Sequence, residues 1–116
     1  MNKVAVIHTA FEDSPRTVAF VDVPDLPSTS EILEYAYRWT NNVMGSWSVK
    51  LKYFPENNEK NGDYNENVTV MAPLHVDENG KEWGHRSTSV GDQMLIGNKK
   101  YVVASFGFET LDGEKV

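Results

Sequence analysis

The feature that most limits how this chain of 116 residues can fold is a turn followed by a hairpin near its C-terminus. Residues 93–104 form two extended segments joined by Gly97-Asn98, a dipeptide typical of a two-residue hairpin loop. In that register Met94 faces Tyr101, and the side of the hairpin that carries both should be buried. Residues 89–92, Ser-Val-Gly-Asp, supply the turn before it, because glycine tolerates unusual backbone angles and the Ser and Asp side chains can bond nearby amides.

Further strands are expected along the rest of the chain. Residues 4–8 and 17–23 are rich in β-branched and aromatic side chains and are separated by a turn-forming Glu-Asp-Ser-Pro cluster, so they should pair as neighbours. The second segment has apolar groups on both faces, which indicates a central place in the sheet. Residues 47–54 alternate strictly between apolar and polar side chains, and residues 68–72 form another short candidate.

A second hairpin is predicted around Asn79-Gly80. A two-residue turn there would place Glu78 opposite Lys81 and Val76 opposite Trp83, a charge pair and an apolar pair in one register. Between residues 55 and 67 the chain is polar and has no periodicity, so we expect a mobile loop.

One principal helix is expected at about residues 30–42. Ser28 and Glu31 have the spacing of a capping box, and apolar side chains recur beyond them at helical intervals. Asn41-Asn42 and Gly45 indicate its end. The sequence therefore predicts a single α+β domain over residues 1–116, with a mainly antiparallel, curled or barrel-like sheet of five to seven strands packed on this helix.

Composition excludes several classes of protein. The chain has no cysteine, which rules out disulfides, thiolate metal sites and a cysteine nucleophile and fits a reducing compartment. The N-terminus lacks the pattern of a signal peptide, and no apolar stretch is long enough to span a bilayer, so we expect a soluble, cytoplasmic protein that binds no membrane. A net charge of −6 disfavours general binding to nucleic acid.

No pattern of catalytic residues is evident. His75 and Asp77 with His85 are the best candidates for metal ligands, but their spacing is a weak signal and ordinary polar positions are the preferred interpretation. Residues 87–89 place hydroxyls near His85 without the strand-elbow-helix context of a nucleophile, and no glycine-rich phosphate loop is present. We therefore expect no enzyme activity, no metal and no cofactor.

The nearest approach to a binding patch combines basic and aromatic residues that we expect the two hairpins to bring together. Its members are Trp83, His85, Arg86, Lys99, Lys100 and Tyr101. Such a surface is typical of small nucleic-acid-binding modules, which makes direct nucleic-acid binding the alternative function, although the net charge opposes it.

Residues 86–92, Arg-Ser-Thr-Ser-Val-Gly-Asp, and residues 100–109, Lys-Tyr-Val-Val-Ala-Ser-Phe-Gly-Phe-Glu, resemble the C-terminal signature of the YodL-like family. Residues 32–41 resemble the helix that precedes this signature. The family comprises small domains of phages, plasmids and other mobile elements, often found beside anti-restriction domains. The resemblance implies a non-enzymatic accessory protein that acts in the host cytoplasm and binds a host macromolecule, with inhibition of a defence complex as one such role. It implies no catalytic residues.

An acidic surface would suit such a role if the target normally binds nucleic acid, because the surface could compete with nucleic acid for the binding site of the target. The acidic residues are nevertheless spread along the chain without a block of like charge, and solubility explains a net negative charge equally well.

Overall fold

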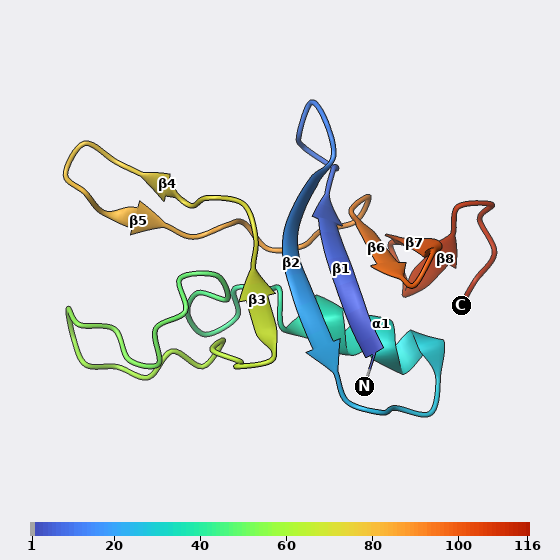
Figure 1. Ribbon diagram of the computed structural model, residues 1–116, viewed down its shortest axis with the longest axis horizontal. Coiled ribbons are helices and arrows are strands. Elements are labelled where there is room, and N and C mark those ends of the chain that lie inside the picture. Colours follow the sequence, from blue (N-terminus) through green and yellow to red (C-terminus); the bar gives the residue numbers. More distant parts are fainter. Residues whose placement is uncertain (1) are drawn as a thin grey trace.

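The computed structural model describes residues 2–116, which form one helix and eight strands. The strands are β1 (Asn2–His8), β2 (Arg16–Val23), β3 (Val68–Val70), β4 (His75–Val76), β5 (Glu82–Trp83), β6 (Gln93–Ile96), β7 (Lys99–Val103) and β8 (Phe108–Thr110). Six of them form an antiparallel sheet in the order β3-β2-β1-β6-β7-β8, while β4 and β5 pair with each other (Figure 1). The α+β class is confirmed.

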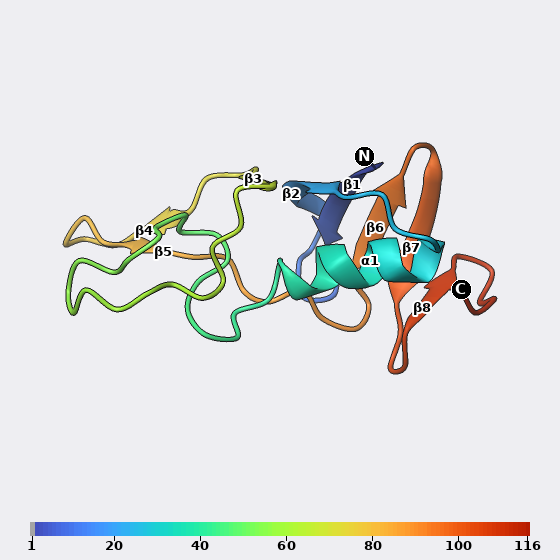
Figure 2. The ribbon, with the colours of Figure 1, turned by 90° about the horizontal axis from the view of Figure 1, so that it is seen from below.

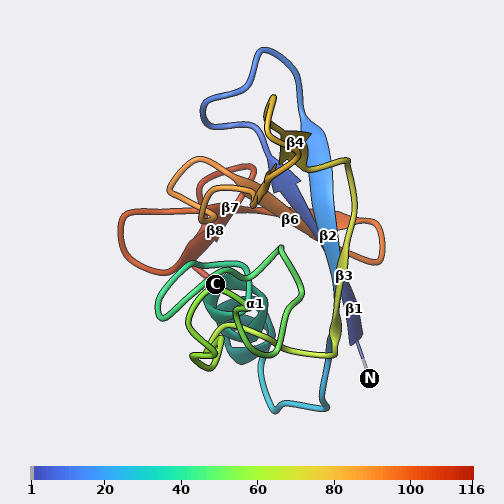
Figure 3. The same cartoon turned by 90° about the vertical axis from the view of Figure 1, so that its left-hand side faces the viewer.

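The sheet bends around the helix but does not close. Figure 3 shows the strands curving past α1 (Thr29–Arg38), with β3 at one edge and β8 at the other. The barrel-like alternative is therefore wrong, and an open curved sheet stands in its place. The predicted pairing of the first two strands is confirmed, and β2 lies inside the sheet between β1 and β3.

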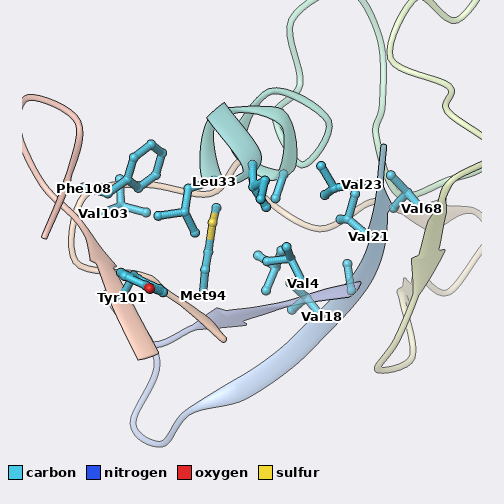
Figure 4. Packing of buried hydrophobic residues seen from close by; sticks show 14 of the residues in the cluster. Val4, Val18, Val21, Val23, Leu33, Val68, Met94, Tyr101, Val103 and Phe108 are labelled. Atoms are coloured by element: carbon cyan, nitrogen blue, oxygen red, sulfur yellow. The ribbon is translucent and has the colours of Figure 1, made fainter. Parts of the chain in front are cut away.

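The hydrophobic core lies between α1 and the face of the sheet that it covers (Figure 2). Leu33 of α1 points toward Met94 of β6, and both side chains are almost fully buried (Figure 4). Valines from β1 and β2 fill the other side of this layer: Val4, Val6, Val18, Val21 and Val23. The helix is too short to cross a bilayer, and the described residues form no other helix.

The helix begins as predicted but ends early. The Ser28 hydroxyl accepts a hydrogen bond from the Glu31 amide at 3.2 Å, which confirms the cap. The predicted end near residue 42 is wrong, because the helix stops at Arg38 and Trp39 caps it. The side chains of Thr40 and Asn41 donate to carbonyl groups of the last turn, where they satisfy acceptors that a longer helix would have used.

The C-terminal hairpin has the predicted register. Met94 pairs with Tyr101, and both side chains are buried in the core. Gly91 has a φ of 96°, and a Cβ there would meet Ala10 at 3.3 Å, so the turn before the hairpin requires glycine. The chain then turns again and adds β8 to the edge of the sheet, a strand that was not predicted.

The strand predicted at residues 47–54 is wrong. Trp47 is fully buried as its apolar character suggests, but the backbone does not stay extended beyond it. Lys50 adopts a left-handed φ of 62°, and the Ser46 hydroxyl accepts from the Val49 amide to form a turn. A single bridge between Tyr53 and Lys60 is what remains of sheet structure here.

The hairpin of β4 and β5 exists, but its register is shifted by one residue from the prediction. His75 pairs with Trp83 and Val76 with Glu82, so the loop between Asp77 and Lys81 holds three residues. The Asp77 carboxylate decides this register, because it accepts from two loop amides and from the indole N–H of Trp83. We call residues 74–84, which carry this hairpin away from the main sheet, the arm.

The segment from residue 55 to 67 is irregular as predicted, but its second half does not behave as a solvated loop. Asn61 and Asp63 are buried. The Asn61 side chain accepts from the amides of Ser46 and Asp63, and its Nδ2 donates to the carbonyls of Ser46 and Leu51. Residues 61–63 are therefore packed and hydrogen-bonded, and they organise the neighbouring loop, while mobility of the segment stays a prediction.

Replacing Asn61 tests this organisation. In Asn61→Ala, four backbone groups lose their partner, and we expect the free energy of unfolding to fall by about 2–4 kcal/mol. Urea unfolding followed by tryptophan fluorescence measures the change. The matched control is Asn57→Ala, an exposed site with one bond to the Glu59 amide, where about 0.5 kcal/mol is expected. Equal losses in the two variants would contradict the assignment.

Candidate functional site

The strongest concentration of titratable side chains lines a cleft between the end of β1 and the base of the arm. The cleft has a volume of about 470 Å³. Its lining includes the side chains His8, Glu12, Arg16, His75, Trp83, His85 and Arg86. All three histidines of the chain therefore line the same cleft, which makes it the leading candidate for a chemical site.

Arg86 is bonded on every side of its guanidinium group. It donates to both carboxylate oxygens of Asp92, at 2.7 and 2.8 Å, and to both carboxylate oxygens of Glu12, at 2.8 and 3.1 Å. Its Nη1 also reaches the Ser87 carbonyl at 2.9 Å. The bonds to Asp92 raise the pKa of Arg86 above its usual range. This side chain serves as a cross-link, and all of its N–H donors are engaged within the protein, which leaves none for a nucleic acid.

Asp92 is the buried partner in this pair. Besides Arg86, the amides of Thr9, Ala10 and Ser89 donate to its carboxylate at 2.8–3.0 Å. Burial alone would raise the pKa of Asp92, but the bonds from Arg86 and the three amides outweigh burial and hold it well below its usual range. The turn-forming role predicted for this residue is confirmed by the Ser89 bond, whereas its link to β1 was not foreseen.

His8 ends a chain of buried hydroxyl groups. Its Nε2 lies 2.9 Å from the Thr88 hydroxyl, which bonds the Thr40 hydroxyl at 2.8 Å. Thr40 must donate its proton to the Ala36 carbonyl, so Thr88 donates to Thr40 and accepts from His8. The network therefore fixes the neutral His8 tautomer with its proton on Nε2. Burial lowers the pKa of His8 to about 4, despite the Asp92 carboxylate 4.0 Å away.

The cleft offers little for catalysis. A histidine with this pKa is a weak base at neutral pH, and its N–H is already engaged. The Ser87 hydroxyl accepts from the Asn42 amide, and Ser89 donates to the Ser87 carbonyl, so neither serine pairs with a histidine. Within residues 2–116, no three His, Asp or Glu side chains lie close enough together to hold a metal ion. The candidate ligands at positions 75, 77 and 85 therefore do not form such a group.

The predicted basic and aromatic patch is divided by the fold. Trp83, His85 and Arg86 line the cleft, and the His85 ring packs 5.7 Å from Trp47. Lys99 and Lys100 are exposed on β7, which Figures 1 and 2 place at the opposite end of the molecule from β5. The sequence did not indicate that Glu12 would bond Arg86 or that His8 would bond Thr88, because the two residues of each pair lie 74 and 80 positions apart along the chain.

Comparisons of the chain with protein-family profiles, curated proteins and solved structures found no significant match. The geometry of the chain itself therefore carries the functional argument. The resemblance of residues 86–92 and 100–109 to the YodL-like family stays a prediction.

The His8 network makes stability depend on pH. The pKa of about 4 in the folded protein lies below the ordinary value of 6.5, so the unfolded chain binds more protons in this range. The contribution is complete above pH 6.5 and is lost as pH falls toward 4. Between pH 7 and pH 5 we expect the free energy of unfolding to drop by about 2 kcal/mol from this residue.

Urea unfolding at the two pH values measures this drop. The variant His8→Gln has no titrating group and should lose most of the difference between pH 7 and pH 5, whatever its absolute stability. The variant His75→Gln, at an exposed position, should keep it. An unchanged pH dependence in His8→Gln would refute the assignment.

The Arg86–Asp92 pair should matter more than pairs on the surface. Asp92→Asn leaves Arg86 with a weakened partner and removes a charged acceptor from three amides, so we expect a loss of about 3 kcal/mol. Lys115→Gln breaks the exposed Lys115–Glu109 pair and should cost under about 0.5 kcal/mol. Thermal and urea unfolding give both values, and similar losses would contradict the central role of Asp92.

Proposed function

We propose that the protein is a non-catalytic accessory protein of a bacteriophage or other mobile element, and that it binds a host protein in the host cytoplasm, where it inhibits a defence complex. The origin is supported by the YodL-like signature at residues 86–92 and 100–109. The mode of action is supported by the surface of the arm and of the loop that faces it.

Exposed apolar side chains gather at this end of the molecule. Of the twelve exposed large hydrophobic residues within residues 2–116, six come from the arm and the loop of residues 40–67. They are Val43, Met44, Leu51, Tyr53, Val76 and Trp83. In Figures 1 and 2 the arm and the loop of residues 40–67 lie together at the left of the view, away from the main sheet. Clustered apolar exposure is typical of protein interaction sites.

A groove of about 540 Å³ between the arm and this loop carries the proposal. Leu51, Phe54 and Trp83 line it with apolar surface, while Glu56 and Glu82 add charge. A surface that combines apolar side chains with charged ones is the ordinary composition of a protein interface.

Trp83 is held in place before any partner arrives. Its indole N–H donates to the Asp77 carboxylate at 3.0 Å, and the Lys81 ammonium lies 4.5 Å from the centre of its ring. About half of the side chain is nevertheless exposed. A fixed, exposed tryptophan loses little conformational entropy on binding and is the residue type most enriched among energetic centres of interfaces.

The cleft near His8 does not compete with this proposal. Its charged groups bond one another, and Arg86, Asp92 and Glu12 already form a closed network. A partner that binds in the groove between the arm and the loop leaves this network intact.

Capture from a nuclease-treated lysate of the bacterial host tests the proposal. The immobilised protein should retain a host protein, and Trp83→Ala should reduce the recovery at least tenfold, since tryptophan truncation at an interface centre costs about 2 kcal/mol or more. Phe106→Ala is the matched control, because Phe106 is 85% exposed but follows β7 at the other end. Retention of nucleic acid alone from an untreated lysate, or equal capture by Trp83→Ala, would overturn the proposal.

A further inference from the structure

A separate cleft lies on the loop of residues 40–67, with a volume of about 510 Å³. Its lining contains aromatic, basic and small polar residues: Trp39, Met44, Lys52, Tyr53, Lys60, Asn61, Gly62 and Tyr64. The size is within the range of about 300–1,000 Å³ that small-molecule sites occupy. Neither the predicted patch nor the groove beside the arm includes Trp39 or Tyr64.

The charge of this cleft differs from that of the chain as a whole. The protein has 17 acidic and 11 basic residues, yet the lining includes two lysines and no Asp or Glu. Three aromatic rings accompany the lysines. An anion that also carries a flat ring matches this combination, because lysine attracts the charge and an aromatic face accepts the ring.

Tyr53 and Lys60 form the exposed part of the site. They face each other in an antiparallel bridge, so their side chains leave the backbone on the same side. Hydrogen bonds from the Phe54 amide to the Glu59 carbonyl and from the Asn61 amide to the Lys52 carbonyl hold this register. The acidic neighbour of Lys60, Glu59, is not among the residues that line the cleft. Tyr53 is 58% exposed, so its ring has surface free for stacking.

The remaining rings are already placed beside positive charge. The Lys52 ammonium lies 5.6 Å from the centre of the Tyr64 ring, and the Arg38 guanidinium lies 4.2 Å from the centre of the Trp39 ring. Arg38 is fixed by its bond to the buried Asp63. The cleft is therefore supported by the same buried polar residues that organise the loop, and little rearrangement is needed to receive a ligand.

We propose that this cleft binds a nucleobase together with its phosphate, supplied either by a free nucleotide or by single-stranded nucleic acid. The base stacks on Tyr53, and the phosphate meets Lys52 and Lys60. This activity is separate from the protein partner proposed above, because the lining of this cleft shares no residue with the groove beside the arm.

Fluorescence anisotropy of a fluorescein-labelled dT12 oligonucleotide, with unlabelled ATP as competitor, tests the proposal. At about 50 mM salt we expect saturable binding that weakens as salt increases. Tyr53→Ala should weaken it about tenfold or more, while Tyr53→Phe, which keeps the ring, should bind normally. Lys60→Gln should weaken binding several-fold and lower the salt dependence by about one unit of slope. Displacement by ATP identifies a nucleotide site, and resistance to ATP identifies a strand site.

Lys100→Gln is the matched control, because Lys100 is an exposed lysine on β7 outside the cleft. Near-UV circular dichroism of each variant verifies that its fold is retained. The proposal is overturned if neither dT12 nor ATP binds at low salt, if Tyr53→Ala binds as the original chain does, or if Lys100→Gln weakens binding as much as Lys60→Gln.

Discussion

The buried carboxylate of Asp92 is the interaction on which the rest of the structure depends. Its partners Thr9 and Ala10 are more than eighty residues away along the chain, and they follow directly after β1. A carboxylate taken out of water is costly unless several donors compensate for the lost hydration. Three amides and Arg86 supply those donors, so the β1–β2 loop, the segment that leaves the arm and the start of β6 are joined at one point.

A second buried polar centre, formed by Asn61 and Asp63, stabilises the irregular half of the molecule. Residues 40–67 have one isolated bridge and no helix or strand of their own, so their backbone groups need partners from side chains. Asn61 and Asp63 provide them, the latter by accepting from the amides of Val43 and Met44. The groove beside the arm and the lysine-lined cleft both include parts of this loop, and both inherit their shape from these buried residues.

Local signals in the sequence were sufficient where neighbouring residues decide the structure. The Ser28 cap and the pairing of Met94 with Tyr101 follow from spacing and turn chemistry, and both are present. The strand expected at residues 47–54 failed because side-chain bonds from Asn61, ten or more residues away, override its alternation. The predicted basic and aromatic patch was wrong for a similar reason. The arrangement of the strands, which local sequence does not reveal, places β7 with Lys100 far from β5 with Trp83.

Net charge is a poor guide to what the surfaces of this protein can bind. Several charged groups neutralise one another inside the fold, as Arg86 does with Asp92 and Arg38 with Asp63, and contribute little to the outer field. The molecule is 45 Å long, whereas salt screens exposed charges beyond about 8–10 Å. Each face therefore acts through its own residues. A net charge of −6 is therefore compatible with a cleft lined by lysines and aromatic rings, and with a separate groove that has apolar lining residues.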